Sequence, residues 1–302
     1  MRIFVTGATG FIGSNLIKAL ARQTNHAPCI LRKMSSTFEF EKDIKSGCEM
    51  FELDANADNI YQIIQSARPD MIIHLASLTQ RGDRKGQIDQ LIQSNILFPT
   101  KLLEAMVGSG VKHFINTGTS WEHFNGCEDY DPVDLYASTK KAFEDILQYY
   151  VNAHNINALT IKLFDTYGPN DLRPKLFSFF KNANNQEPTD LSPGEQYLDL
   201  LYIDDVTSAY IKAIDYLTLR KHGNLESVFI GYGQSYQLKE IVSMYENISG
   251  TPLNIRWGGR AYREREVMRA QANIKESREK LNWKPKVDLR EGLSKLLSFD
   301  DK

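Results

Sequence analysis

The sequence has few cysteines, little net charge and no long apolar run. Its three cysteines in 302 residues, Cys29, Cys48 and Cys127, lie far apart and form no C-x-x-C pair. Their scarcity excludes a disulfide scaffold and a thiolate-rich zinc site, so we predict no metal centre and a reducing compartment. No apolar run approaches the ~18 residues of a membrane span, and no apolar segment typical of a signal peptide follows the N-terminus. We therefore expect a cytoplasmic protein with no membrane partner.

The net charge is nearly neutral but unevenly distributed. The chain has 36 Lys and Arg against 38 Asp and Glu, a formal charge of -2, which argues against a dedicated nucleic-acid binder. Between Arg256 and Arg290, however, 11 basic residues stand against 5 acidic ones, an excess of +6. Such a stretch is typically a solvated surface, and it can also bind an anionic ligand.

Short apolar runs alternate with longer amphipathic segments through the first half of the chain. Strands are expected at 2–6, 28–31, 49–53, 71–76, 111–116 and 158–164, and helices at 11–23, 57–67, 88–107 and 135–153. This alternation predicts right-handed βαβ units and a parallel sheet. The expected fold class is α/β, a Rossmann-type doubly wound parallel sheet with a smaller C-terminal α/β lobe. The first unit comprises 1–165 and returning segments near 200–230, and the second comprises 166–199 and 231–302.

A glycine-rich segment, Thr6-Gly7-Ala8-Thr9-Gly10-Phe11-Ile12-Gly13, follows the first expected strand. Gly7 permits a tight turn, Gly10 lets backbone N–H groups approach a pyrophosphate, and Gly13 lets the helix pack close to the strand. Three glycines alone are weak evidence, but here a strand precedes them and an amphipathic helix follows. The pattern predicts a dinucleotide cofactor, held by Gly7, Thr9, Gly10, Phe11, Ile12 and Gly13.

The end of the second strand indicates which dinucleotide is bound. A site that prefers NAD usually has an acidic residue there to bind the ribose 2′-OH, whereas this chain has Arg32 and Lys33. A guanidinium suits a 2′-phosphate, so we predict NADP(H); exposed loop cations are the alternative. Asp54 is expected to accept from the adenine amino group. The end of the fourth strand is expected to run beside the cofactor at Leu75, Ala76 and Ser77.

The segment Tyr136-Ala137-Ser138-Thr139-Lys140 places a phenol and an ammonium one helical turn apart. We expect the ammonium to lower the pKa of the phenol, so that Tyr136 can donate or accept a proton near neutral pH. This spacing alone is often only a polar helix face, but downstream of a dinucleotide turn it indicates catalysis. Thr119, at the end of the fifth strand, is expected to point into the crevice where open α/β sheets bind ligands.

Together these motifs resemble those of the extended short-chain dehydrogenase/reductases, in the nucleotide-sugar epimerase/dehydratase group. The resemblance covers essentially the whole chain. It implies that Thr119 positions a substrate carbonyl, Tyr136 is the acid/base, and Lys140 orients the nicotinamide ribose and tunes the tyrosine. Further matching segments are 74–76, 167–169, 202–206 and 281–285.

The same resemblance implies a wider set of contacts. Asn95 would support the lysine through water, and Thr117 and Leu163 would contact the cofactor. Relatives often form dimers through a four-helix interface, so we expect a homodimer, with a nucleotide sugar bound by the second lobe.

Departures from the group's pattern favour one reaction. Its dehydratases have Asp-Glu directly after the threonine, where this chain has Ser120-Trp121, and its epimerases usually keep the acidic ribose ligand that Arg32 replaces. Segments 118–123, 162–171 and 262–266 resemble 4-ketoreductases that act on CDP-linked 4-keto deoxyhexoses. We therefore predict NADPH-dependent reduction of the 4-keto group of a nucleotide-linked deoxy sugar, for O-antigen biosynthesis. An epimerase with tightly bound NAD(P) and a non-catalytic NADP(H)-binding protein are the alternatives.

The candidate substrate residues come from several loops. Leu198 stands where many relatives have an arginine near the substrate diphosphate, so the basic stretch should supply the missing cation. Arg260 and Arg263 are the candidates, with Arg265 behind them. For Trp121 and His123, a core ring and a loop histidine are the alternatives to substrate contact. The remaining predicted contacts are Thr79, Gln80, Arg81, Ser120, Trp121, Glu122, His123, Asp165 and Lys175.

Overall fold

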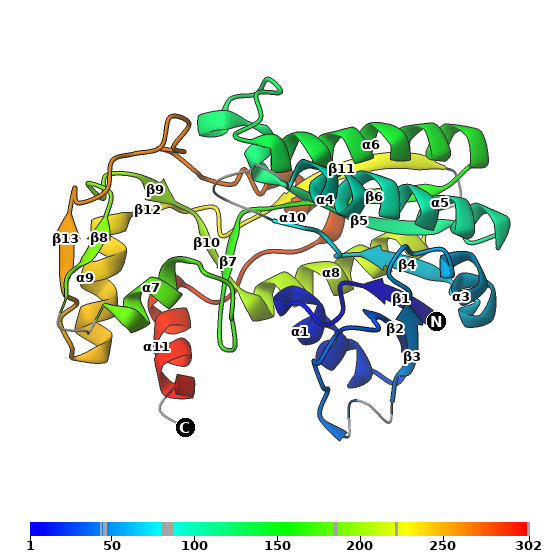
Figure 1. Ribbon diagram of the computed structural model, residues 1–302, viewed down its shortest axis with the longest axis horizontal. Helices are drawn as coiled ribbons and strands as arrows, with labels where there is room; N and C mark the ends of the chain where they lie inside the picture. Colours follow the sequence, from blue (N-terminus) through cyan, green and yellow to red (C-terminus); the bar gives the residue numbers. More distant parts are fainter. Residues whose placement is uncertain (43, 45–46, 80–86, 184–186, 221–222, 301–302) are drawn as a thin grey trace.

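A seven-stranded sheet lies at the centre of the computed structural model, which describes residues 1–302 except 43, 45–46, 80–86, 184–186, 221–222 and 301–302 (Figure 1). Gln80 and Arg81 of the predicted substrate set therefore lie outside the described residues. The strand order is β11-β6-β5-β4-β1-β2-β3, and every neighbouring pair is parallel. The order reverses at β1, as in doubly wound folds, and the predicted fold class is confirmed. The strands are β1 (Arg2–Thr6), β2 (Ala27–Lys33), β3 (Glu49–Leu53), β4 (Met71–His74), β5 (His113–Thr119), β6 (Asn157–Leu163) and β11 (Asn224–Ile230).

Helices cover both faces of this sheet. Side chains alternate along β1, so that Ile3 and Val5 join the core shared with α1 and α8, and Phe4 joins the core shared with α3, α5 and α6. Because both faces are buried, the strands are almost continuously apolar. These helices are α1 (Phe11–Ala21), α3 (Ile60–Ala67), α5 (Phe98–Gly108), α6 (Leu135–His154) and α8 (Ile203–Thr218), and α10 (Lys275–Leu281) packs beside α8 and β11.

Beyond β6 the chain also builds a smaller set of elements, seen to the left of the sheet in Figure 1. Its strands pair as β10 with β7, β12 with β9, and β13 with β8. Among the described residues, no helix is both long and apolar enough to cross a membrane. The elements are β7 (Asp165–Tyr167), α7 (Leu176–Asn182), β8 (Thr189–Leu191), β9 (Tyr197–Leu198), β10 (Leu200–Tyr202), β12 (Tyr236–Gln237), α9 (Leu238–Ser249), β13 (Ile255–Trp257) and α11 (Leu289–Asp300).

The prediction of one continuous helix over 88–107 is wrong. The structure has α4 (Ile88–Ile92), a π-helical turn at Gln93–Leu97, and then α5. Pro99 has no N–H, so it cannot donate the α-helical bond to the carbonyl of Asn95, four residues earlier. Such π turns occur frequently at functional sites, and this one presents the buried side chain of Asn95.

Candidate active site

The glycine turn after β1 leaves no room for side chains. Gly7 has a φ of +68°, and a Cβ there would lie 2.6 Å from the Ala76 nitrogen. A Cβ on Gly13 would lie 2.1 Å from the Gly7 carbonyl oxygen, so α1 packs directly against the turn. The N-cap of α1 is Gly10, which offers no side chain to satisfy the first-turn N–H groups. A close backbone approach with open N–H donors fits the pyrophosphate of a dinucleotide.

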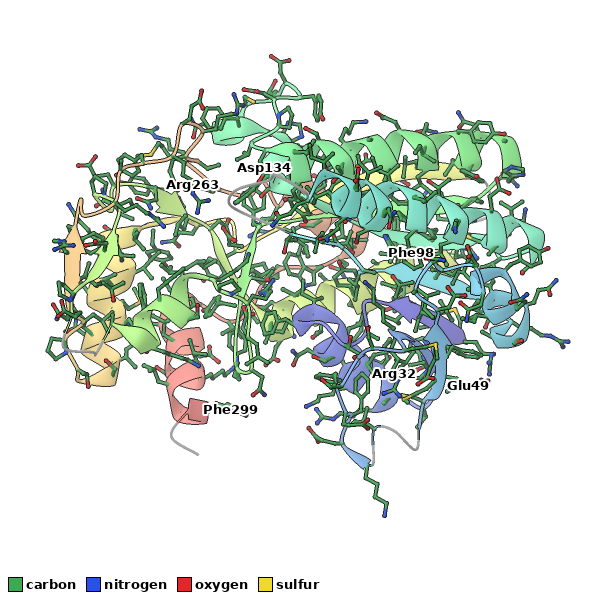
Figure 2. All side chains as sticks on the ribbon, viewed as in Figure 1. Arg32, Glu49, Phe98, Asp134, Arg263 and Phe299 are labelled. Carbon is green, nitrogen blue, oxygen red and sulfur yellow. The ribbon has the colours of Figure 1, made fainter. Side chains whose placement is uncertain are left out.

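Arg32, at the end of β2, is held by carboxylates. Its Nη2 and Nε donate to Glu52 Oε1 at 2.7 and 3.2 Å, and Glu39 lies 3.6 Å from Nη1. Figure 2 shows Arg32 beside β3. The side chain is only 18% exposed, so Arg32 is not a freely solvated loop cation, whereas Lys33 is exposed. The choice between the two dinucleotides stays a prediction.

Asp54 shapes the loop after β3. Its carboxylate accepts the N–H groups of Asn56, Asp58 and Asn59 at 3.1, 2.9 and 3.0 Å. The side chain therefore orders the turn that leads into α3, and its contact with an adenine amino group stays a prediction.

Asn95 links the loop after β4 to α6. Its Oδ1 accepts from the Leu78 N–H at 2.8 Å and the Ser77 hydroxyl at 3.2 Å, and its Nδ2 donates to the Leu78 carbonyl. Nδ2 also donates to Thr139 Oγ1 at 3.0 Å, and that hydroxyl donates to the Tyr136 carbonyl at 2.7 Å. This network fixes the first turn of α6 beside Ser77, while water-mediated support of the lysine stays a prediction.

Tyr136 and Lys140 lie on the first turns of α6, which begins with Asp134 accepting the Ala137 N–H at 2.9 Å. Burial raises the pKa of Tyr136 to about 12, and a hydrogen bond with Ser77 opposes that rise only partly. Burial also lowers the pKa of Lys140 to about 8, against the opposing effect of two glutamates. The expected lowering of the phenol pKa by the lysine is therefore wrong, because burial is the largest effect on that pKa. The phenol therefore keeps its proton at neutral pH.

The end of β5 directs two threonines differently. Thr117 makes a 2.7 Å hydrogen bond with the Tyr210 hydroxyl of α8, and Thr119 Oγ1 accepts the Trp121 N–H at 3.3 Å. Thr119 thereby caps a short 3₁₀ turn, Ser120–Glu122. Leu163 of β6 is the register partner of Thr119. Thr117, Thr119 and Leu163 therefore lie at the C-terminal ends of two neighbouring strands.

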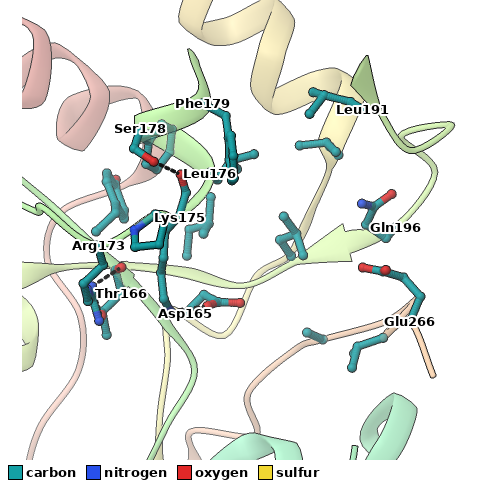
Figure 3. Close-up of a pocket in the computed structure, with 18 of the residues that line it drawn as sticks. Asp165, Thr166, Arg173, Lys175, Leu176, Ser178, Phe179, Leu191, Gln196 and Glu266 are labelled. Atoms are coloured by element: carbon teal, nitrogen blue, oxygen red, sulfur yellow. Dashed lines mark hydrogen bonds and ion pairs between the residues drawn. The ribbon is translucent and has the colours of Figure 1, made fainter. Parts of the chain in front are cut away.

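A cavity of about 770 Å³ lies between the segment that follows β5 and the smaller set of elements, and Thr119, Tyr136 and Lys140 adjoin it without lining it. Five of the predicted substrate residues line it: Trp121, Asp165, Lys175, Arg260 and Arg263. Lys175 Nζ donates to Asp165 Oδ1 at 2.7 Å (Figure 3 draws both side chains). Arg263 reaches the cavity from the segment that follows β13 (Figure 2).

Other predicted contacts lie elsewhere. Thr79, Ser120, Glu122 and His123 do not belong to the cavity lining. Glu122 is 1% exposed and pairs with Lys162 at 2.8 Å, and His123 Nδ1 lies 2.9 Å from the Asp129 carbonyl oxygen. For Glu122 the structure corrects the prediction of a direct substrate contact, because the carboxylate is sealed inside the protein.

Arg173 also lines the cavity, and the sequence analysis did not predict it as a site residue. Arg173 donates from Nε and Nη2 to the Asp171 carboxylate, at 2.7 Å each. Its Nη2 also donates to the Thr166 carbonyl at 3.0 Å, and Figure 3 shows Arg173 beside Thr166. The guanidinium lies 4.5 Å from the Phe11 ring centroid, so Arg173 spans the cavity and the glycine turn. The only available signal was a charged pair inside a Gly/Pro/Asn-rich loop. Other missed lining residues include Ser178, Leu191, Gln196 and Glu266.

The doubly wound parallel sheet and the glycine turn after β1 define a Rossmann-type fold. Residues 3–231 match the model of the NAD dependent epimerase/dehydratase family. The chain belongs to this family, whose members modify nucleotide sugars.

Individual relatives narrow the comparison. The chain is 31% identical over 271 residues to a CDP-abequose synthase of Yersinia pseudotuberculosis, covering 89% of this chain and 91% of the relative. It is 27% identical to the CDP-abequose synthase of Salmonella muenchen, covering 99% and 98%. Among solved structures, the UDP-glucuronic acid 4-epimerase of Bacillus cereus, in complex with UDP-glucuronic acid and NAD, matches with a TM-score of 0.84. That match has 24% identity and covers 100% of this chain and 99% of the other, and it supports the fold alone.

Proposed function

We propose that this protein is an NADPH-dependent 4-ketoreductase of a nucleotide-linked deoxy sugar, with a CDP-linked sugar favoured, in the biosynthesis of surface-polysaccharide sugars. The observation that carries the proposal is that Thr119 and the start of α6, which bears Tyr136 and Lys140, adjoin the cavity. Trp121, whose N–H Thr119 accepts, and Asp134, the N-cap of α6, both line the cavity. Ser120-Trp121 after the threonine lacks the carboxylates of a dehydratase. The similarity to relatives named CDP-abequose synthase supports the same assignment.

The glycine turn fits the pyrophosphate of the cofactor, because a Cβ on Gly7 or Gly13 would collide with the backbone. The backbone around Gly7, Gly10 and Gly13 would bind the pyrophosphate, and Arg32 with Lys33 would face the 2′-phosphate. When bound, the dihydronicotinamide supplies the hydride for the reduction. We assign this role to residues 1–165 and segments near 200–230, and the substrate to 166–199 and 231–302. The full cofactor set is Gly7, Thr9, Gly10, Phe11, Ile12, Gly13, Arg32, Lys33, Asp54, Leu75, Ala76, Ser77, Asn95, Thr117, Tyr136, Lys140 and Leu163.

The chain's own residues supply the proton and hold the carbonyl. Tyr136, protonated at neutral pH because burial raises its pKa to about 12, donates its proton to the substrate oxygen as negative charge develops there. Thr119 donates a hydrogen bond to the same oxygen. Lys140, an ammonium below its pKa of about 8, stabilises the phenolate that remains and binds the ribose hydroxyls.

The substrate diphosphate is assigned to Arg260 and Arg263. Both line the cavity, and Leu198, where relatives have arginine, lines it too. In this chain, the segment after β13 would therefore supply the cations for the diphosphate, in place of an arginine on β9. Guanidinium groups bind phosphate oxygens by paired hydrogen bonds, which would hold the sugar end near Trp121.

A homodimer is also proposed, with α4 and α6 as the contact surface. Ile88, Ile92 and Tyr149 expose 53%, 40% and 62% of their surface there. Pairing these helices with a second copy would remove apolar area from water. Sedimentation would test this assignment independently of activity.

The test of the activity is consumption of reduced cofactor. NADPH oxidation should be screened against CDP-, GDP-, dTDP- and UDP-linked 4-keto-6-deoxy sugars, with turnover expected for the CDP-linked one. Tyr136→Phe should lower turnover by about 100-fold or more, the usual contribution of a general acid, and leave NADPH binding intact. Full activity in this variant would overturn the mechanism.

An epimerase is the second candidate, favoured by the family match and by Glu52, whose carboxylate lies beside Arg32 and offers a partner for a ribose hydroxyl. An epimerase with tightly bound NAD(P) would interconvert sugars with no net change in nicotinamide absorbance. A non-catalytic NADP(H)-binding protein would bind cofactor and turn over nothing in the panel; the intact Thr119, Tyr136 and Lys140 argue against it.

A further inference from the structure

Four buried ionisable side chains, one of them that of Lys140, lie where α6 packs against β5, β6 and the turn after β5. Glu122, Lys140, Glu144 and Lys162 are each less than 10% exposed. Lys162 Nζ lies 2.8 Å from Glu122 Oε2 and 3.9 Å from Glu144 Oε2. Isolated buried charges are strongly unfavourable, so a cluster of four in the interior calls for a physical explanation.

The chain brings this cluster together from three elements. Lys140 and Glu144 are four residues apart on α6 and therefore share one face, and both are buried. Glu122 ends the turn after β5, and Lys162 comes from the neighbouring strand β6. A Cβ on Gly118 would lie 3.1 Å from Lys162 Cγ and 3.4 Å from Glu122 Oε1. The glycine thus leaves the space that the Glu122–Lys162 pair occupies.

Lys140 obtains its compensation at longer range. In the described part of the chain, no carboxylate lies within ion-pair distance of the Lys140 ammonium, whereas the Lys162 ammonium has two carboxylates within that distance. Glu122 and Glu144 are nevertheless the groups that favour its charged form against burial. In a low-dielectric interior such an interaction remains strong beyond contact distance. Burial raises the pKa of Glu144, and Lys162 opposes that rise. With both carboxylates ionised and one intervening ammonium, one net negative charge faces Lys140.

We propose that Glu122 and Glu144, bridged by Lys162, are positioning residues that hold Lys140 as an ammonium inside the protein. This inference deepens the proposed function, because an uncharged Lys140 could not stabilise a phenolate on Tyr136. The carboxylates act through Lys140 and do not touch the substrate themselves.

Two further titratable groups near Lys140, His74 and Tyr136, are uncharged at neutral pH. His74 of β4 is fully buried, and burial together with Lys140 lowers its pKa well below the usual value. Tyr136 on α6 is a neutral phenol, because burial raises its pKa to about 12. Lys141, on the solvent side of α6, forms an ion pair with Asp145. The anions that face Lys140 are therefore the two buried glutamates.

The titration of Lys140 in the ligand-free protein is a direct test. NMR of protein labelled at the lysine ε-carbons, with the signal assigned by its loss in Lys140→Met, should give a midpoint near pH 8. In Glu144→Gln the midpoint should fall by about one pH unit, the size of a neighbouring-charge effect. Glu144→Asp should recover most of that fall. Asp145→Asn, a carboxylate removed one residue away on the exposed side of the same helix, should leave the midpoint unchanged.

A second variant and a second readout keep the alternatives apart. Glu122→Gln should lower the midpoint in the same direction; an unchanged midpoint in both glutamine variants overturns the inference. A wild-type midpoint well below pH 7 overturns it too, even if neither variant folds. If the midpoints shift as expected but NADPH reduces none of the nucleotide-linked 4-keto-6-deoxy sugars, the positioning role stands and the proposed reaction is wrong. If reduction occurs, the alkaline limb of its pH profile should move with the NMR midpoint in Glu144→Gln.

Discussion

Replacing Lys140 by methionine should stabilise the fold while abolishing turnover. The ammonium is inside the protein, 2% exposed, and its pKa falls from 10.5 to about 8 because burial penalises the charge more than the two glutamates favour it. Methionine has a similar length and no charge, so it removes the penalty without leaving a large cavity. Lys140 would then be a residue that the proposed catalysis requires and that lowers the stability of the fold.

The magnitude follows from linkage between protonation and folding. A tenfold change in a proton-binding constant corresponds to about 1.36 kcal/mol. The fall in the pKa of Lys140 from 10.5 to about 8 therefore predicts a gain of about 3 kcal/mol at pH 7. The unfolded chain binds more protons than the folded chain between the two pKa values, 8 and 10.5. Wild-type stability therefore rises with pH through that interval, and the advantage of Lys140→Met should shrink to about 1.4 kcal/mol at pH 9.5.

Urea unfolding of both proteins at pH 7 and pH 9.5, followed by tryptophan fluorescence, measures this difference. Lys141→Met is the matched control, because Lys141 pairs with Asp145 on the exposed side of the same helix; its stability should change by less than about 1 kcal/mol. A loss of stability in Lys140→Met at pH 7, or a gain of equal size at both pH values, would refute the reasoning.

Two further variants test the ends of the proposed ligand site. Arg263→Ala should raise the KM for the nucleotide sugar by about tenfold or more, as the loss of one charge-assisted hydrogen bond predicts, with little change in the dissociation constant of NADPH; in Arg256→Ala, which loses a guanidinium already paired with Asp190, KM should stay near the wild-type value. Arg32→Ser should weaken binding of NADPH but not of NADH in a fluorescence titration; equal loss for both would remove the 2′-phosphate assignment.

The periodicity of the sequence was sufficient for the main sheet but not for the π turn. Strands buried on both faces give apolar runs, and the helices between them give amphipathic ones, so strand and helix positions are local information. The interruption at Gln93–Leu97 depends on Pro99 together with the bonds that Asn95 makes to Ser77, Leu78 and Thr139. A local pattern does not contain those partners, which lie up to 44 residues away.

The site divides in the same way. The glycine turn and the Tyr136–Lys140 spacing are short motifs, whereas Arg173 reaches the cavity only because Asp171 and Phe11 orient it. Neighbours in sequence also diverge: Trp121 lines the cavity, while Glu122 is buried beside Lys162. In a 3₁₀ turn successive side chains point about a third of a turn apart. Adjacent side chains there point in different directions, which is why Trp121 lines the cavity and Glu122 does not.

The basic stretch near the C-terminus shows why a charge count overstates a binding site. Arg256 is paired with Asp190, and Arg265 is paired with Asp131 and stacks on Phe124. Lys280 is shared between Glu226 and Glu276. These partners, apart from Glu276, lie outside the stretch, so much of its excess of +6 is neutralised by tertiary contacts. The cations that remain at the cavity are set by position, and a diphosphate would meet Arg260 and Arg263, not the net charge of the segment.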